Sequence, residues 1–267
     1  MIHTLFAIFV IVVSLAYFIL ILIYLKNWKT LKTTVLPEYF VGKTRISVII
    51  PIRNEGKNIS TLLQSILSNN YTTSLLEIII VDDHSTDDGY QIIQSFVDDR
   101  ISILSLADFD LPERFNSFKK FGIEKAVSQA KGELIITTDG DCIVPSDWLN
   151  YFAYSYEMEG NNFIAAPVNF KYTFTDLSAF QCLDFMGMML ITGANIKRKT
   201  SMMCNGANLG YSRKLFLDLG GYVGINDQAS GDDVMLLNKV SNAPQGQIGF
   251  IKNAHATVST QGVENWS

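Results

Sequence analysis

The stretch ELIITTDGDC, Glu133 to Cys142, predicts a buried strand that ends in an acidic turn. Its apolar half is rich in isoleucine, which is typical of a strand buried on both faces of a parallel sheet. Two carboxylates, Asp139 and Asp141, then flank Gly140. Two like charges side by side are unfavourable unless a positive group lies near them. A solvated turn accounts for the pattern, because Asp and Gly are common turn residues. A metal-bound phosphate accounts for it as well, and the rest of the chain decides between the two.

Apolar runs with polar ends recur on both sides of this stretch and predict further strands. They cover residues 46–50, 77–81, 101–106 and 163–168. Between the first two runs, NISTLLQSILSN has apolar residues at helical spacing, with Asn58 as the expected N-cap, and residues 123–130 predict another helix. Alternating strands and helices indicate an α/β layer fold with a mostly parallel sheet. Ligands of such sheets bind beyond the carboxyl ends of the strands.

Acidic or polar clusters follow three of the predicted strands. They are PIRNEG at 51–56, DDHSTDDG at 82–89 and the DGD that contains Asp139 and Asp141. In the expected fold they converge, so a bound cation or a basic ligand contact is implied. A hard divalent cation such as Mg²⁺ or Mn²⁺ prefers oxygen ligands and often bridges carboxylates to phosphates. A nucleotide diphosphate fits this description. Lys119 and Lys120 could add positive charge against it, although a solvated helix face explains them equally well.

A fourth acidic pair, Asp232 and Asp233, precedes an apolar helical stretch at 234–240. Acids are favoured at a helix N-terminus by the helix dipole, which is one explanation of the pair. The other is catalysis, because a neighbouring carboxylate raises the pKa of the first and suits one of them to act as a general base.

The N-terminus predicts a membrane anchor. Residues 5–25 carry no charge, and as a helix they would span roughly 30 Å, the thickness of a bilayer core. A cleavable signal peptide would have basic residues in front, whereas here Lys26, Lys29 and Lys32 follow the run. We therefore expect a retained transmembrane helix over residues 1–25 and a linker over 26–45. The positive-inside rule places the rest on the cytoplasmic face of the inner membrane.

Composition limits the remaining function classes. The 267 residues suffice for one α/β domain plus an appendage, and the net charge of −5 gives no basic field for nucleic acid. Cys142, Cys182 and Cys204 are far apart and lack metal-site spacing, so we interpret them as packing residues.

Five stretches, taken together and in order, resemble the family 2 glycosyltransferases with a GT-A fold. They are SVIIPIRNEGKNI, IIIVDDHSTDDG, AKGELIITTDGDC, GANLGYSRKLFLDLGGY and SGDDVML. The third is similar to the family's Asp-x-Asp metal motif, with Gly140 where alanine is commoner. The resemblance spans about residues 44–267 and implies a nucleotide-sugar-binding domain over 46–267, preceded by one transmembrane helix.

The resemblance also implies a role for each residue that matches a family motif. The nucleotide would be bound by the first two stretches: Pro51, Arg53 and Glu55 at uracil and ribose, and Asp83 at the base with Asp82 in support. Near the diphosphate, Asp139 would face the ribose or diphosphate and share a divalent metal (Mg²⁺ or Mn²⁺) with Asp141. Independently of the resemblance, Lys120 is assigned to the substrate for its charge. At the reacting sugar, Asn205, Gly206 and Asn208 would approach the donor, and Asp233, tuned by Asp232, would be the catalytic base.

The reaction implied is inverting transfer of a hexosyl group from a nucleotide-diphosphate sugar, expected to be a UDP-sugar. A lipid phosphate, a glycolipid and a growing polysaccharide all fit the acceptor. Processive and related membrane members carry a Q-x-x-R-W segment soon after the base, which this sequence lacks. We therefore expect an N-terminal portion of a longer protein.

Three alternatives compete with the transferase. A nucleotidyltransferase would need a glycine-rich phosphate loop, and PIRNEG has one glycine. A receiver-like signalling domain would be about half this size and would not need both later acidic pairs. A membrane-anchored nucleotide-binding regulator without catalysis keeps every carboxylate, and a product assay separates it from the enzyme.

Overall fold

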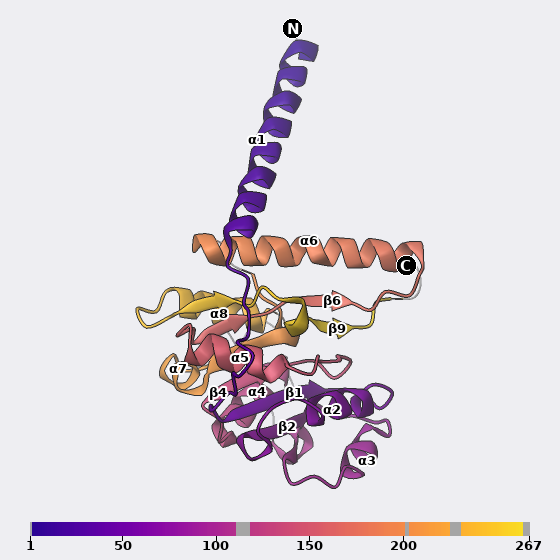
Figure 1. The fold of residues 1–267 in the computed structure, drawn as a ribbon. Coiled ribbons are helices and arrows are strands. Elements are labelled where there is room, and N and C mark those ends of the chain that lie inside the picture. The colour runs from indigo at the N-terminus through magenta and orange to yellow at the C-terminus, as the bar shows by residue number, and fades with distance from the viewer. Residues whose placement is uncertain (1, 111–117, 201–202, 225–230, 264–267) are drawn as a thin grey trace.

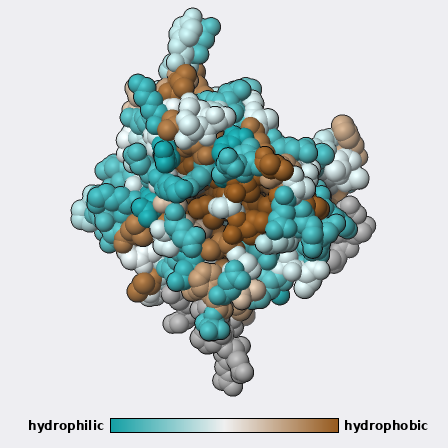
Figure 2. All heavy atoms as spheres, turned by 90° about the horizontal axis from the view of Figure 1, so that it is seen from below, coloured by the Kyte–Doolittle hydropathy of each residue, from teal (hydrophilic) through white to brown (hydrophobic). Residues whose placement is uncertain are grey.

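The structure is a computed structural model, and it describes every residue except 1, 111–117, 201–202, 225–230 and 264–267. An α/β body carries helix α1 (Ile2–Thr30), which rises from one end of it, and helix α6 (Asp176–Arg198), which runs across the foot of α1 (Figure 1; the molecule is seen from below in Figure 2). Both helices are long and apolar enough to cross a membrane, judged by length and composition alone.

The body is built on a central sheet with the strand order β3-β2-β1-β4-β7-β5-β8 in the described part of the chain. The parallel half consists of β1 (Ile46–Ile52), β2 (Leu76–Asp82), β3 (Ile101–Ser105) and β4 (Leu134–Thr137). Strand β7 (Leu209–Ser212) is antiparallel to β4 and to β5 (Phe163–Ala165), and β5 is parallel to β8 (Ile248–Phe250). The prediction of a mostly parallel central sheet is confirmed.

Helices cover both faces of this sheet. Val48 and Ile50 of β1 belong to one hydrophobic cluster with α2 (Ile59–Leu67) and α5 (Trp148–Glu157). The alternate residue Ile49 faces a second cluster, which includes α4 (Phe118–Gln129), α7 (Arg213–Asp218) and α8 (Asp232–Ser241). Burial on both faces explains why the strand sequences are continuously apolar. The short helix α3 (Gly89–Gln94) packs beside α2.

The structure differs from the sequence prediction in three places. The run at 163–168 is split at Pro167, which cannot donate to a ladder: β5 ends before it, and β6 (Val168–Phe170) pairs instead with β9 (Val258–Thr260) in a separate small sheet. Helix α1 continues to Thr30, so the start of the expected linker is helical. Asn58 occupies the N-cap position of α2 without capping it: its Nδ2 donates to Glu55 Oε2, and its Oδ1 accepts from Gln261 Nε2.

Four short 3₁₀ turns complete the part of the fold that the structure describes. They are η1 (Thr73–Leu75), η2 (Leu106–Asp108), η3 (Gly206–Asn208) and η4 (Ala254–Ala256).

Candidate active site

The carboxyl ends of β1 and β2 lie side by side, with Ile52 in register with Asp82. The loops that follow are tied together by hydrogen bonds. The Asn54 N–H donates to Ser85 Oγ over 3.0 Å, and the Thr86 N–H donates to Asn54 Oδ1 over 2.7 Å. Asn54 adopts a left-handed φ of 58°, which asparagine tolerates better than most residues. The two loops therefore form one rigid rim.

Arg53 and Asp83, both predicted to bind the nucleotide, meet on this rim. Arg53 Nη1 lies 3.5 Å from Asp83 Oδ2, and His84 Nδ1 lies 2.9 Å from Asp83 Oδ1. The Arg53 side chain is 62% exposed and free to reorient toward a ligand. Asp82 is buried and accepts a bond from the Ser85 N–H, which agrees with a supporting role.

Glu55 packs against the acidic turn after β4. A Cβ added to Gly140 would lie 2.8 Å from Glu55 Cγ and 3.0 Å from Ile52 Cγ2. Glycine at this position, where the family more often has alanine, therefore makes room for Glu55. The first and third strand-end clusters are in contact.

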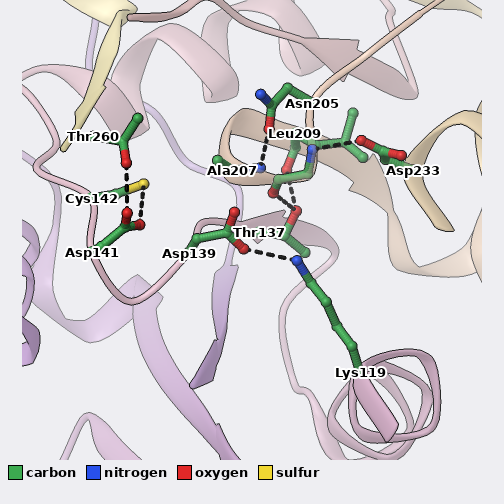
Figure 3. Close-up of polar contacts among 11 residues, drawn as sticks. Lys119, Thr137, Asp139, Asp141, Cys142, Asn205, Ala207, Leu209, Asp233 and Thr260 are labelled. Atoms are coloured by element: carbon green, nitrogen blue, oxygen red, sulfur yellow. Dashed lines mark hydrogen bonds and ion pairs between the residues drawn. The ribbon is translucent and has the colours of Figure 1, made fainter. Parts of the chain in front are cut away.

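Lys119 is the lysine beside the acidic turn. Its Nζ lies 2.9 Å from Asp139 Oδ1 in an ion pair that Figure 3 shows reaching across from α4. Lys120, the lysine assigned to the substrate, is buried in the body with its Nζ 3.8 Å from Met235 Sδ. In this structure Lys119 occupies the position expected of Lys120.

Asp141 lies on the other side of the same turn. Its Oδ2 accepts a bond of 2.7 Å from Thr260 Oγ1 of β9, and Cys142 Sγ lies 3.7 Å from its Oδ1 (Figure 3). Burial and the charges of Asp139 and Asp141 raise the pKa of the Cys142 thiol to about 12, so this cysteine stays protonated.

The carboxylate oxygens of the turn are suitable ligands for a hard divalent cation that also binds a diphosphate. Asp139 and Asp141 offer carboxylate oxygens, the ligands that Mg²⁺ and Mn²⁺ prefer. Among the described residues no group of three or more His, Cys, Asp or Glu side chains is arranged to hold a metal. Any ion here would thus take most of its ligands from phosphate and water.

Asp233 is joined to the end of β4 through η3. Its Oδ2 accepts the Gly206 N–H over 3.0 Å, and the Gly206 carbonyl accepts the Thr137 hydroxyl over 2.7 Å (Figure 3). Thr137 stands two residues before Asp139, so the candidate base and the acidic turn are positioned by one short chain of hydrogen bonds. Pro51, Lys119, Asp232 and Asp233 line one small pocket.

The electrostatics of this pocket suit a base. Burial raises the pKa of Asp233, and the charge of Asp232 adds to the rise. The N–H groups of Val234 and Gly206 and the charge of Lys119 oppose it without cancelling it. Partial burial lowers the pKa of Lys119, but Asp139, Asp232 and Asp233 more than offset this, and the pKa is raised. Lys119 is thus a cation surrounded by carboxylates.

Two of the residues assigned to the donor sugar have other contacts. Asn208 is fully buried: its Oδ1 accepts from Trp148 Nε1 over 2.8 Å, and its Nδ2 donates to the carbonyls of Pro167 and Ala256. These contacts lie within the body, and an approach of Asn208 to the donor sugar stays a prediction. The Asn205 side chain caps η3 through the Ala207 N–H.

Several residues of the site carry no sequence signal of their own. Thr137 and Thr260 are hydroxyl residues among many, and only the paired strands bring them to Gly206 and Asp141. Asn54 and Asp87 lie within the clusters PIRNEG and DDHSTDDG. The Asp87 carboxylate accepts hydrogen bonds from the N–H groups of Gly56 and Gly89. Turn-forming composition could have pointed to these two residues.

The chain matches the family described as Glycosyl transferase family 2 over residues 47–220. It belongs to this family. The match covers the first three stretches and the fourth as far as Gly220, and the Asp232–Asp233 pair follows it. The rim with Arg53 and Asp83, the acidic turn and Gly206 all lie within the region that matches the family 2 glycosyltransferases.

Relatives support the same family. Glycosyltransferase AglE of Haloferax volcanii is 26% identical over 201 residues, which is 74% of this chain and 62% of AglE. Glycosyltransferase GlyG of Streptococcus pneumoniae is 34% identical over 110 residues, 39% of this chain and 32% of GlyG. The chain thus spans less than two thirds of either relative.

Solved structures share the fold. Mannosyltransferase PcManGT from Pyrobaculum calidifontis, in complex with GDP-Man and Mn²⁺, gives a TM-score of 0.70 at 20% identity, covering 95% of this chain and 68% of that one. S. aureus TarS in complex with UDP gives a TM-score of 0.60 at 17% identity, covering 82% of this chain and 60% of that one. The expected GT-A fold is confirmed.

Proposed function

We propose that this chain carries an inverting glycosyltransferase that moves a sugar from a nucleotide diphosphate, UDP in the first instance, to the hydroxyl of a lipid or saccharide acceptor. The observation that carries the proposal is the position of Asp233. It is a partly buried carboxylate with a raised pKa, joined through Gly206 to Thr137, the last residue of the strand that precedes Asp139. A nucleotide regulator without catalysis has no need of a base held in this way.

The residues divide into two groups in the proposed reaction. The donor is bound by the rim of Arg53, Asp83 and Glu55, and its diphosphate lies near Lys119 and the acidic turn. The acceptor approaches Asp233, which takes the proton of the attacking hydroxyl as the acceptor oxygen bonds to the anomeric carbon and the diphosphate leaves. Holding both substrates in line supplies much of the acceleration.

Asp139 and Asp141 would hold the divalent metal. When bound, Mg²⁺ or Mn²⁺ neutralises negative charge on the leaving diphosphate. The complex of PcManGT with Mn²⁺ supports this assignment by analogy of fold. Asp141→Ala should abolish the stimulation of nucleotide binding by metal, and an unchanged metal response would contradict the assignment of Asp141.

We place the domain, residues 46–267, on the cytoplasmic face of the inner membrane, held there by α1. The most apolar segment of α1 has a mean hydropathy of 3.1, and the body buries none of it. Retention on membranes after alkaline carbonate washing tests the anchor, and protease access from one side only tests the orientation.

The nucleotide is tested directly by titration with UDP and GDP, since PcManGT is in complex with GDP-Man and TarS with UDP. A preference for UDP supports the present proposal. A preference for GDP keeps the transferase and changes the donor.

The decisive experiment compares Asp233→Asn with Asp232→Asn in the full-length protein in membranes. Losing a general base costs about 10²- to 10⁴-fold in rate. Transfer should fall by that order in Asp233→Asn, with nucleotide affinity nearly unchanged, while Asp232→Asn should lose less. Near-normal transfer by Asp233→Asn would move the base elsewhere, and loss of UDP binding would place Asp233 in the donor site.

A further inference from the structure

We propose that α6 lies in the plane of the membrane surface, with its outer face among the lipid headgroups and upper acyl chains, and does not cross the bilayer. The inference goes beyond the catalytic assignment, and it rests on the proposed anchoring by α1. Together the two helices would hold the catalytic body at a fixed height and tilt above the membrane.

The inner side of α6 is part of the body. It packs on β6 and β8. In the most apolar 18-residue segment of α6, 33% of the residues are buried, whereas none are buried in the corresponding segment of α1. Met189 and Ile196, about two helical turns apart, are buried against the body. A helix fixed to the body along one side cannot leave it to span a bilayer without exposing these residues.

The outer side of α6 is apolar and exposed. Phe180 is 57% exposed, Leu183 70% and Met186 55%. Asp184 lies on the same exposed side. A carboxylate at the bilayer centre is costly, whereas at headgroup level it remains hydrated. An apolar face interrupted by one acidic residue is therefore more favourable in a helix at the membrane surface than in a helix that spans the bilayer.

Lys252 and Asn253 join the C-terminal end of α1, and the segment after it, to the body. Lys252 Nζ donates to the Trp28 carbonyl over 2.6 Å and to the Leu31 carbonyl over 3.1 Å, and it lies 4.7 Å from the centre of the Trp28 ring. The Lys252 ammonium thus satisfies carbonyls at the C-terminal end of α1 that lack helical partners. Below it, Asn253 Nδ2 donates to the Thr34 carbonyl over 2.7 Å.

The foot of α1 also rests directly on α6. A Cβ on Gly193 would lie 2.8 Å from the Trp28 ring and 3.1 Å from Leu31, so glycine permits the close approach of the two helices. Figure 1 shows α6 running across the foot of α1, with the body on the opposite side. If α1 crosses the membrane, α6 lies along its surface.

The residues at this level are those of a membrane interface. Trp28 stands at the end of α1, among Lys26, Lys29 and Lys32, and tryptophan and lysine are enriched where helices leave lipid. The last turn of α6 is also basic, with Lys197 and Arg198. Cations at this depth attract anionic headgroups.

The loop before α6 agrees with this orientation. Tyr172 is 49% exposed and Phe174 87%, and their rings pack together at 4.8 Å between centroids. Amphipathic helices of this kind bury their apolar face roughly 5–10 Å into the headgroup region.

The test measures depth at two points along α6. Phe180→Cys and Met188→Cys, made separately in the full chain, are labelled with an environment-sensitive fluorophore in vesicles of phosphatidylcholine and phosphatidylglycerol. Quenching is compared between lipids that carry a nitroxide near the headgroup and lipids that carry it deep in the acyl chain. The wild-type chain, with Cys142, Cys182 and Cys204, gives the background, and Val97→Cys, 101% exposed beyond α3, is the matched control in water.

An in-plane α6 predicts stronger shallow than deep quenching at both sites, with equal depths, and no quenching at Val97. A spanning α6 would instead separate the two depths by about 12 Å, the length of eight helical residues, and would overturn the proposal. Labels that no lipid quenches would overturn it as well. In that case, cross-linking that rises with protein concentration would identify a second copy of the chain as the cover of α6.

Carbonate washing of the same vesicles separates this inference from the proposed anchor. Retained protein with unquenched α6 labels contradicts the position of α6 and leaves the anchor standing. Protein that washes off contradicts the anchor, and the in-plane assignment that rests on it fails too.

Discussion

Lys119 Nζ and Asp139 Oδ1 lie 2.9 Å apart, at the edge of a pocket that also contains Asp232 and Asp233. The ion pair is partly exposed, with side-chain exposures of 43% and 39%, so its own contribution to stability is small. Its importance is electrostatic, because the positive charge of Lys119 opposes the rise in the pKa of Asp233. The pair therefore couples the acidic turn to the candidate base.

Replacing Lys119 should shift the pH dependence of transfer. Lys119→Gln removes a cation that favours ionised Asp233, so the pKa of Asp233 should rise further. Since the base acts in its deprotonated form, the acidic limb of the rate profile should move to higher pH. The profile of kcat against pH measures the shift. Lys214→Gln, which removes another surface lysine paired with an aspartate, is the control and should leave the profile unchanged. A Lys119→Gln profile that overlays the wild type would show that Asp233 does not set the acidic limb.

Adding a methyl group at Gly140 should disturb nucleotide binding through Glu55. In Gly140→Ala the new Cβ would lie 2.8 Å from Glu55 Cγ, and crowding of this kind costs about 1–3 kcal/mol when the neighbour cannot move. Glu55 has room on the loop, so we expect the fold to persist and the nucleotide affinity to fall several-fold. Calorimetric titration with UDP measures it. The double variant with Glu55→Ala should show little extra loss over Glu55→Ala alone. Additive losses would mean that the two residues act independently.

Asn208 should matter for stability more than for the reaction. Asn208→Leu leaves Trp148 Nε1 and the carbonyls of Pro167 and Ala256 without their partner, and each unsatisfied buried group costs about 1–3 kcal/mol. We expect a loss of at least about 2 kcal/mol in the free energy of unfolding, read from the denaturant midpoint in detergent. Asn205→Ala removes one capping bond and should cost about 1 kcal/mol. A stable Asn208→Leu protein that no longer binds donor would restore the sugar contact expected from the sequence.

Removing Lys252 should loosen the joint between α1 and the body. Lys252→Met keeps the length of the side chain and loses the bonds to the Trp28 and Leu31 carbonyls and the cation over the Trp28 ring. We expect faster proteolysis in the segment of residues 31–45, with membrane retention intact because α1 itself is unchanged. Lys171→Met, at an exposed site before α6, is the control. Equal cleavage rates in wild type and Lys252→Met would show that other contacts hold the joint.

The sequence by itself determined the parallel half of the sheet, the strand-end clusters and the helical N-terminus. Short isoleucine-rich runs such as 46–50 and 77–81 identify strands buried on both faces, and period and composition are local properties that a sequence displays directly. The acidic pairs at 139/141 and 232/233 were visible for the same reason. Resemblance to family motifs then gave the family, which the match over residues 47–220 confirmed.

Tertiary structure decided the contacts that join segments distant in the chain. Lys119 and Lys120 are adjacent in sequence, and only the packing of α4 turns one toward Asp139 and buries the other. Asn208 lies in a family-like motif, yet its amide is used by Trp148, Pro167 and Ala256, each from a different segment. The antiparallel insertion of β7, the split at Pro167 and the course of α6 across the foot of α1 likewise depend on non-local packing. A side chain's direction is set by which partners the fold brings to it, and local pattern carries no record of those partners.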